Sequence, residues 1–412
     1  MTTITECRAC GWAPLEPVLS LGNMPLANSL LDHVDAEEAR YPLDLVRCSR
    51  CDLVQITETV PPEILFREYS YFSSYSDTFV EHARTFAARM REHVDLGSES
   101  LVVEAASNDG YLLQFFAEAG VPVLGVEPAR NVAAAASARG IPTIAEFLDA
   151  ELARALVVKR GRHADLVVAN NVLAHVADLH GFVDGLRLLA GDGLVSVEVP
   201  YVCELVDRME FDTIYHEHLC YFSLTSLSRL FAEHGLTVVD VERLAVHGGS
   251  LRVFARAGGA RSHAVDAVLE RETEWGVGDP LRYATFARSV DELRASIASF
   301  VGDLVASGNH VAGYGAAAKA VVLSNACGLD GSRVEYVVDR NPHKQGKLLP
   351  GVRIPVRPPG ALLETRPGYV LLFVWNIAAE VIEQQREFIE GGGTFIVPIP
   401  QPRSASSAEL RL

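Results

Sequence analysis

Four cysteines arranged as two close pairs constrain the N-terminal part of this chain more than any other feature. Cys7 and Cys10 form one Cys-x-x-Cys pair, and Cys48 and Cys51 form the second. Two such pairs are typical of a tetrahedral Zn²⁺ site to which each pair supplies two thiolates. Because sulfur would fill every position, no place is left for water, and we expect a structural metal rather than a catalytic one. The segment between the pairs, 15–45, must then fold back as a hairpin or a small lobe.

A second organised unit begins near residue 101, where short apolar runs alternate with helical patterns. Residues 101–104 predict a strand, 105–110 a turn of small and polar residues, and 111–118 a helix. Further strands are predicted at 121–126, 165–171 and 193–200. This alternation predicts an α/β fold, a Rossmann-like domain with a doubly wound, mostly parallel sheet. Its ligand is expected outside the carboxyl ends of the strands.

The turn after the first of these strands favours one kind of cofactor. A dinucleotide-binding turn needs Gly-x-Gly-x-x-Gly, but Ala106 and Asn108 replace the first two glycines, and Asp109 would repel a pyrophosphate. Glu127 ends the next strand, at the spacing where an acid binds the two hydroxyls of a ribose. A cationic ligand with a ribose and no phosphate, S-adenosylmethionine, fits this pattern; a domain that has lost its ligand is the alternative. The predicted cofactor-binding residues are Glu104, Ala106, Asn108, Asp109, Gly110, Glu127 and Asn170.

The run Asp-Thr-Ile-Tyr-His-Glu-His at 212–218 gathers residues able to take, give or orient protons. If the run is helical, Tyr215 and His218 share a face, whereas a loop leaves their geometry open. The two histidines are two residues apart, which excludes His-Glu-x-x-His zinc chemistry. A solvated polar turn is the alternative interpretation.

A third unit follows a charged, helix-like connection at 262–300. Residues 311–319 match a strand, a glycine turn and a helix, and 336–339 supply a second strand that ends in an acid. We therefore expect a second Rossmann-like lobe. Gly315 in the turn and Lys319 in the helix suit an anionic ligand such as a phosphate. A NAD site, which would make the protein an oxidoreductase or epimerase, and a vestigial lid are the alternatives.

Composition excludes several classes of function. The net charge of −17 argues against a nucleic-acid partner and disfavours a membrane surface. No apolar run reaches the roughly 20 residues that span a bilayer, and residues 1–8 lack a signal-peptide pattern. With 412 residues, of which 49% are hydrophobic, the chain is long enough for two to three domains. We expect a cytoplasmic protein, and its oligomeric state is left open.

Several motifs together resemble one family, the S-adenosylmethionine-dependent C-methyltransferases of nucleotide-linked 4-keto deoxysugars, which include C-3 methyltransferases of antibiotic sugars. They are the two cysteine pairs and the segments 20–27, 108–110, 211–218, 246–249, 313–316 with Lys319, and 344–346. The resemblance implies structural zinc, a sugar-nucleotide substrate of the dTDP type, and an active site at Tyr215, Glu217 and His218. It also implies that the C-terminal lobe helps to hold the substrate. At the position of Ala106 this family usually has glycine, and alanine is tolerated there if φ is negative.

The chemistry of such a reaction suggests a role for each candidate. Removing a proton beside a ketone needs a base of near-neutral pKa, which an unperturbed histidine has, and we assign this role to His218. Tyr215 is expected to donate to the enolate oxygen and Glu217 to orient a histidine. His175 follows the strand that ends at 170–171, where the methyl acceptor should meet the cofactor. Further candidates for the substrate pocket are Tyr201 and His247.

The predicted organisation has three domains. They are a zinc-binding domain at 1–65, a methyltransferase domain at 66–260 and a substrate-binding lobe at 261–412. Methylation at carbon of a substrate other than a sugar, and a zinc-stapled scaffold without activity, remain as alternatives.

Overall fold

The computed structural model describes residues 2–69, 72–244 and 248–405. Its N-terminal sheet is antiparallel and has the order β11-β4-β3-β2. The strands are β2 (Glu16–Pro25), β3 (Arg40–Arg47), β4 (Val54–Ile56) and β11 (Cys220–Tyr221), and a separate pair joins β1 (Thr2–Thr3) to β5 (Glu58–Thr59). The β2–β3 hairpin lies between the two cysteine pairs, so the predicted fold-back is confirmed. Strand β11 comes from far along the chain and completes this sheet.

The central sheet has seven strands in the order β12-β13-β10-β9-β6-β7-β8. They are β6 (Val102–Ala105), β7 (Val123–Val126), β8 (Thr143–Ile144), β9 (Leu166–Asn170), β10 (Leu194–Pro200), β12 (Thr237–Leu244) and β13 (Ser250–Arg256). The first five are parallel to one another, and β13 is antiparallel to both β10 and β12. The predicted doubly wound, mostly parallel sheet is confirmed.

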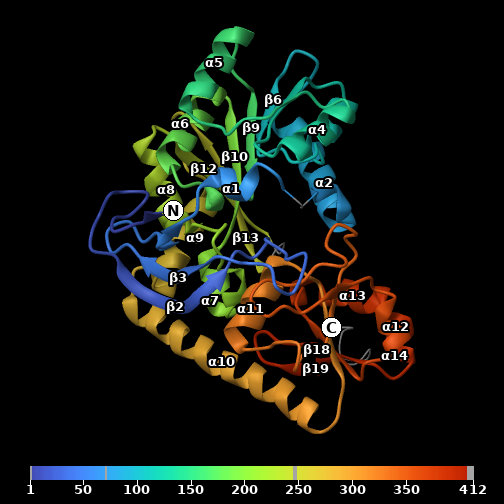
Figure 1. Cartoon of the computed structure of the whole chain (residues 1–412). Coiled ribbons are helices and arrows are strands. Elements are labelled where there is room, and N and C mark those ends of the chain that lie inside the picture. The colour runs from blue at the N-terminus through green and yellow to red at the C-terminus, as the bar shows by residue number, and fades with distance from the viewer. Residues whose placement is uncertain (1, 70–71, 245–247, 406–412) are drawn as a thin grey trace.

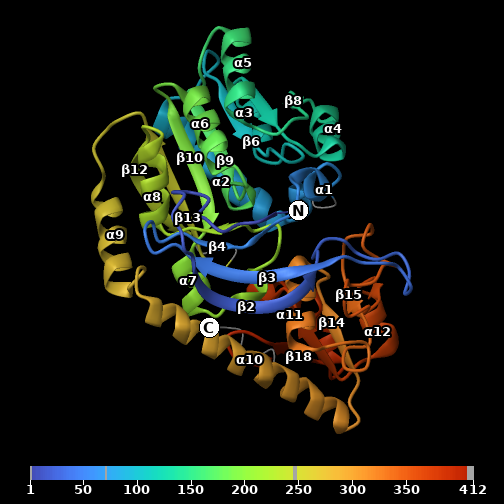
Figure 2. The ribbon, with the colours of Figure 1, turned by 60° about the vertical axis from the view of Figure 1, so that its left-hand side comes forward.

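Helices cover both faces of this sheet, as Figures 1 and 2 show. They are α2 (Asp77–Val94), α3 (Leu113–Glu118), α4 (Arg130–Ala138), α5 (Ala150–Arg160), α6 (Leu179–Ala190) and α8 (Leu224–Glu233), whereas α7 (Val202–Asp207) follows β10 and lies below the sheet in both views. Helix α6 illustrates why they form: Leu179, Phe182 and Leu186 are buried at helical spacing, and Asp178 accepts a hydrogen bond from Gly181 N at the N-cap. Short elements connect the layers: α1 (Pro62–Phe66), η1 (Ser73–Tyr75), η2 (Leu173–His175) and η3 (Phe211–Thr213).

The C-terminal lobe has a second doubly wound sheet, of order β16-β15-β14-β17-β18-β19. Its strands are β14 (Val311–Tyr314), β15 (Val337–Val338), β16 (Val356–Arg357), β17 (Tyr369–Leu372), β18 (Thr394–Val397) and β19 (Arg403–Ala405). In chain order this is 3-2-1-4-5-6, the order of a dinucleotide-binding fold, with only the edge strand β19 antiparallel. The remaining elements are α11 (Ala318–Cys327), α12 (Ala361–Thr365), η5 (Trp375–Ile377), α13 (Ala378–Gln384) and α14 (Arg386–Glu390).

Two helices and a hairpin loop connect the C-terminal lobe to the rest of the chain. Helices α9 (His263–Trp275) and α10 (Pro280–Ala306) form the predicted connection, and α10 passes below the β2–β3 hairpin to the C-terminal lobe (Figure 2). The loop of that hairpin also reaches the lobe: Leu31 pairs with Leu348, and Glu38 accepts a hydrogen bond of 2.6 Å from Gly351 N. The β2–β3 hairpin therefore contacts the C-terminal lobe directly as well as through α10.

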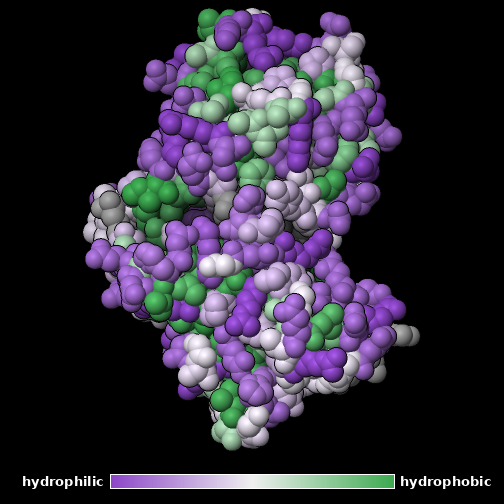
Figure 3. Space-filling model, turned by 45° about the vertical axis from the view of Figure 1, so that its right-hand side comes forward, coloured by the Kyte–Doolittle hydropathy of each residue, from purple (hydrophilic) through white to green (hydrophobic). Residues whose placement is uncertain are grey.

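The surface agrees with the charge of the sequence. On the face shown in Figure 3, hydrophobic residues form small separate patches in a mostly hydrophilic surface, and the outline is indented between the upper and lower parts. Within the described residues, no helix combines the length and the apolar character needed to cross a bilayer.

Candidate functional site

The four predicted metal ligands lie together. Their sulfur atoms are all within 4.8 Å of one another, with Cys7 3.5 Å from Cys51 and Cys10 3.5 Å from Cys48. The hydrogen bond with the Cys51 thiol lowers the pKa of Cys7 to about 5, and the Gln55 amide adds a donor at 3.3 Å. Four cysteine side chains lie close together, and the lowered pKa of Cys7 favours its thiolate form. This arrangement fits a structural Zn²⁺ ion.

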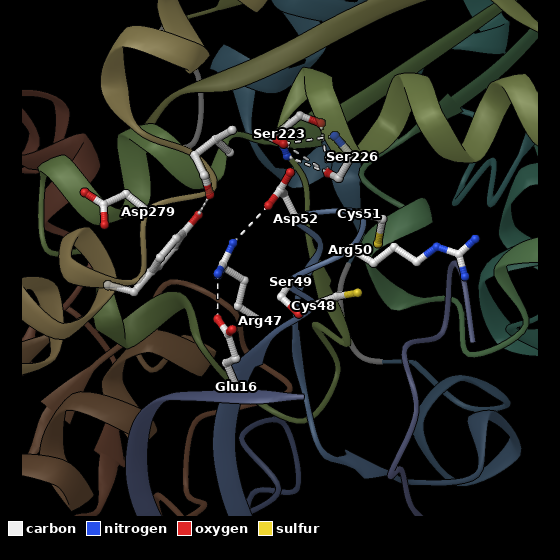
Figure 4. Close-up of polar contacts among 12 residues, drawn as sticks. Glu16, Arg47, Cys48, Ser49, Arg50, Cys51, Asp52, Ser223, Ser226 and Asp279 are labelled. Atoms are coloured by element: carbon white, nitrogen blue, oxygen red, sulfur yellow. Dashed lines mark hydrogen bonds and ion pairs between the residues drawn. The ribbon is translucent and has the colours of Figure 1, made fainter. Parts of the chain in front are cut away.

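Ion pairs fix the turn that carries Cys48 and Cys51 (Figure 4). Arg47 is bound to Asp52 at 2.9 Å, and Asp52 in turn is bound to Arg229 of α8 at 2.6 Å. The Arg47 and Asp52 side chains are largely buried, so the contact between them is poorly screened by solvent, whereas the Arg229 side chain is half-exposed. The zinc site is thereby anchored to the central unit.

The predicted cofactor turn closes against the end of β7. The carboxylate of Glu127 accepts hydrogen bonds from Asn108 N at 2.9 Å and from Ala129 N at 2.8 Å. Burial raises the pKa of Glu127 to about 6. Glu127 therefore braces the turn in addition to standing where a ribose is expected.

Three buried acceptor atoms gather at the carboxyl ends of β6 and β9. Within the described residues, Glu104 Oε2, Asp109 Oδ1 and Asn170 Oδ1 have no hydrogen-bond partner. Burial, with smaller contributions from Glu127 and Asp109, raises the pKa of Glu104 well above its ordinary value. Acceptors without donors suit a ligand that carries positive charge, hydroxyls and amino groups, so the residues present fit S-adenosylmethionine.

The second carboxylate oxygen of Asp109, Oδ2, has hydrogen-bond partners. Asp109 Oδ2 accepts hydrogen bonds from Arg139 at 2.9 Å and from Ser74, and Ser73 N donates to Asn108 Oδ1 at 2.9 Å. The charge of Asp109 is thus partly balanced by Arg139, which the sequence did not predict. The segment before α2 lies against the cofactor turn.

Ala106 does not meet the condition under which alanine is tolerated at its position. Its φ is +54°, in the left-handed region, rather than negative. The backbone bends there because Ala106 N and Ser107 N both donate to Val126 O, at 2.7 and 3.3 Å. A Cβ atom in this region is unfavourable by about 1 kcal/mol, which explains why glycine suits the position.

Replacing Ala106 by Gly is expected to raise the thermal midpoint by about 2 °C, because the strain is relieved. Differential scanning calorimetry measures the change. As a control, Ala105→Gly in β6 should lower the midpoint, since that residue lies in a buried strand. A lower midpoint for Ala106→Gly would contradict the strain argument.

Replacing Glu127 by Ala is expected to weaken S-adenosylmethionine binding by roughly 1 to 3 kcal/mol, the scale of a hydrogen bond to a charged group. Isothermal titration calorimetry measures the affinity. Glu127→Gln keeps one acceptor for the turn and should lose less. Unchanged affinity in a well-folded Glu127→Ala protein would place the ribose elsewhere.

The run 212–218 begins with the last two residues of η3 and continues as a turn, so Tyr215 and His218 do not share a helix. Tyr215 Oη nevertheless lies 2.9 Å from His218 Nε2, and His218 Nδ1 lies 2.9 Å from Thr213 O. Because a carbonyl oxygen only accepts, Nδ1 carries the proton of the neutral ring and Nε2 accepts from the Tyr215 hydroxyl. The structure therefore brings Tyr215 and His218 into contact and selects one tautomer of the His218 ring.

His175 lies beside this pair. Its ring is 4.8 Å from that of His218 and 5.6 Å from that of Phe66, between ring centres. Burial lowers the pKa of His175 to about 4, and its Nδ1 has no hydrogen-bond partner within the described residues. His175 is therefore a neutral group at neutral pH with one free ring nitrogen.

Among the described residues, Asn28 and Tyr69 rather than a histidine are the hydrogen-bond partners of the Glu217 carboxylate. It accepts a hydrogen bond of 2.7 Å from Asn28 and a longer one of 3.5 Å from Tyr69. Burial raises the pKa of Glu217 to about 7. The backbone carbonyl of Thr213 orients His218 instead.

Sequence reasoning missed Asn28 and Tyr69. Asn28 directly follows the motif at 20–27, which is the only local signal, and it reaches Glu217 across 189 positions of the chain. Tyr69 also binds Asn131 at the N-terminal end of α4 through its backbone, at 3.1 and 2.7 Å. It therefore contacts both the cofactor half and the run 212–218.

The predicted substrate-binding residues do not all lie near Tyr215 and His218. Tyr201 is buried beside Glu272 and Cys203, in the core of the central unit. Lys319 holds its ammonium 4.4 Å above the ring of Trp375, and 3.3 Å from Asn376 Oδ1. His247 lies outside the described residues.

Gly315 occupies the turn after β14 with φ +93°, and a Cβ there would lie 2.6 Å from Val374. Asp339 at the end of β15 accepts from Ala316 N and Asn341 N, both at 2.8 Å. This repeats the arrangement at Glu127. In both lobes an acid at the end of the second strand ties down the turn after the first.

Sequence comparisons cover almost the whole chain. Three family models match it: "Putative zinc binding domain" at 7–66, "Methyltransferase domain" at 79–241 and "C-methyltransferase C-terminal domain" at 245–400. The chain is similar to C-methyltransferase NovU of Streptomyces niveus, with 44% identity over 411 residues, covering 98% of this chain and 97% of that protein.

Solved structures resemble less than half of the chain, and more distantly. Magnesium protoporphyrin IX methyltransferase from Synechocystis PCC 6803 with bound SAM is 15% identical and has a TM-score of 0.32, covering 44% of this chain and 79% of the other. An S-adenosylmethionine-dependent methyltransferase from Clostridium acetobutylicum ATCC 824 is 10% identical with a TM-score of 0.35, covering 44% and 92%. The family assignment accordingly depends on the sequence matches.

Proposed function

Since this chain belongs to the family of S-adenosylmethionine-dependent C-methyltransferases, we propose that it methylates a nucleotide-linked 4-keto deoxysugar at C-3, through an enolate, in the biosynthesis of a branched antibiotic sugar. The hydrogen-bonded pair of Tyr215 and His218 carries this proposal. A base and a hydroxyl donor held together are what enolisation beside a ketone needs.

The pair supplies the proton transfer. Thr213 O holds His218 with Nε2 as its basic atom, so His218 removes the proton from the carbon beside the carbonyl. Tyr215 turns its hydroxyl from Nε2 to the carbonyl oxygen, where the negative charge of the enolate develops. S-adenosylmethionine supplies the methyl group that the enolate carbon receives. His175, neutral and half-buried beside His218, keeps water from the reacting carbon and offers its free nitrogen to a substrate hydroxyl.

We place the nucleotide on the C-terminal lobe. A hollow of about 350 Å³ lies at the carboxyl ends of its strands, lined by Asp77, Arg340, Pro359, Gln384 and Gln385. Ligands of doubly wound sheets bind at this edge, and Arg340 is suited to a diphosphate. Lys344 donates to Ala316 O at 2.9 Å, and its charge also acts on Glu217. The sugar would therefore lie between this edge and Tyr215.

The three predicted domains are retained as part of this proposal. The division at 260 falls between β13 and α9, whereas the division at 65 falls inside α1. The family assignment argues against a NAD-dependent oxidoreductase and against an inactive scaffold.

A panel of nucleotide-linked 4-keto sugars tests the substrate. The protein with S-adenosylmethionine should add one methyl group to dTDP-4-keto-6-deoxyglucose or a related 4-keto sugar, seen by mass spectrometry and placed at C-3 by NMR. The corresponding 4-hydroxy sugars serve as controls, because they form no enolate. Methylation of simple ketones but of no nucleotide sugar would contradict the proposal.

A further inference from the structure

Trp375 lies where the C-terminal lobe meets the run 212–218. Its indole Nε1 donates a hydrogen bond of 2.7 Å to Asp212 Oδ2, across 163 positions of the chain. The ammonium of Lys319 lies 4.4 Å from the centre of the Trp375 ring. Asp212 is fully buried in η3, immediately before the residues assigned to catalysis.

The Asp212 carboxyl group, which accepts this hydrogen bond, is buried and has few other donors near it. Burial raises the pKa of Asp212, while Lys319 and the Trp375 donor oppose that effect and favour the carboxylate. The second oxygen, Oδ1, has no hydrogen-bond partner within the described residues. A buried carboxylate with so few donors depends heavily on each of them, so Trp375 restrains the position of η3.

The position of η3 sets the orientation of His218. The helix ends at Thr213, whose carbonyl oxygen accepts the Nδ1 proton of His218 at 2.9 Å. That contact selects the tautomer in which Nε2 faces the Tyr215 hydroxyl at 2.9 Å. A shift of η3 would move the carbonyl and with it the ring.

Trp375 is also next to the expected ligand edge of its own lobe. It begins η5, which follows shortly after β17, and β17 neighbours β14 at the place where the strand order reverses. The preceding residue, Val374, packs against Gly315 so closely that a Cβ on the glycine would lie 2.6 Å away. A ligand on the Gly315 turn would therefore act on Trp375 through Val374.

We propose that Trp375 is a positioning residue that links the C-terminal lobe to the Tyr215–His218 pair through Asp212 and Thr213. When the lobe binds its part of the substrate, Trp375 fixes η3 and so holds the His218 ring in its working orientation. This inference builds on the proposed function, because it takes the pair to be the catalytic one.

The test compares two tryptophans with the same type of contacts. Trp375→Phe removes the donor to Asp212 but keeps a ring below Lys319. The matched control is Trp275→Phe, because Trp275 Nε1 donates to Asp207 at 2.8 Å and Arg282 lies 4.6 Å over its ring, outside the site. With dTDP-4-keto-6-deoxyglucose, Trp375→Phe should lower kcat roughly 10- to 100-fold while KM and the affinity for the cofactor stay unchanged. The control variant should keep the kcat of the wild-type protein.

A second readout needs no substrate. The ¹⁵N signals of the His218 ring, assigned by their loss in His218→Asn, should move in Trp375→Phe and stay in place in Trp275→Phe. Trp375→His, which retains a ring donor, should restore part of kcat and of the signal. Unmoved His218 signals in a folded Trp375→Phe protein would overturn the inference. If wild-type protein leaves the sugar unmethylated, the proposed function fails, while the NMR comparison still decides the role of Trp375.

Discussion

Replacing Cys48 by Ser is expected to unfold the N-terminal sheet and to remove the bound zinc. A structural Zn²⁺ ion contributes on the order of 10 kcal/mol to the folding of a small module, more than a short hairpin and a three-residue strand supply by themselves. Metal analysis should find near-stoichiometric zinc in the wild-type protein and little in the variant. Hydrogen exchange should show the loss of protection in β2, β3 and β4.

The same change should abolish methyl transfer, because the zinc-bound sheet holds the run 212–218. Ile56 N donates to Leu219 O at 3.0 Å, His216 Nε2 lies 3.1 Å from Pro42 O, and Asn28 binds Glu217. Binding of S-adenosylmethionine should be less affected, since its site lies on the central sheet.

The control is Cys327→Ser, which changes a buried cysteine of α11 outside the metal site. It should retain the metal and the protection of the N-terminal strands. Freshly purified wild-type protein without zinc, or a Cys48→Ser variant with an intact N-terminal sheet, would contradict the structural role of the metal.

Replacing His218 by Asn should depress turnover by about 10² to 10⁴ while S-adenosylmethionine still binds, because a positioned base contributes that much. The matched control is His163→Asn: His163 Nδ1 also lies 2.9 Å from a backbone carbonyl, that of Leu188, but the residue is exposed. Steady-state rates with a 4-keto nucleotide sugar measure the loss, and calorimetry measures the retained cofactor affinity.

Proton removal can be separated from methyl transfer in deuterium oxide. With S-adenosylhomocysteine bound, the wild-type protein should exchange the hydrogen beside the carbonyl, and His218→Asn should lose this exchange together with methylation. Tyr215→Phe should retain part of both, because Tyr215 donates only to the oxygen.

Two results would change the assignment of roles. Exchange that persists in His218→Asn but vanishes in Tyr215→Phe would make the phenolate the base and reverse the two roles. Normal exchange and methylation in both variants would reduce the run to a structural turn and move the chemistry to residues such as His175.

The elements and the order of units were predictable from the sequence. Spacing within a few residues determines them: the two Cys-x-x-Cys pairs predicted the metal cluster, and the alternation of apolar strands and helices predicted both doubly wound sheets. The same local pattern singled out Tyr215 and His218, although their contact is made in a turn rather than on a helix. The physical reason is that backbone periodicity and ligand spacing are short-range properties.

Only the tertiary structure decided the partners of the site residues. Asn28 and Trp375 reach Glu217 and Asp212 across 189 and 163 positions, and no local pattern contains such a contact. The positive φ of Ala106 arises because its turn is bent against β7, and not from its own side chain, which disfavours that conformation. Glu127 likewise appeared in the sequence as a ribose ligand, but its bracing of Asn108 depends on how β6 and β7 are placed side by side. Long-range packing sets these contacts, because it brings together groups whose separation along the chain carries no information about their distance in space.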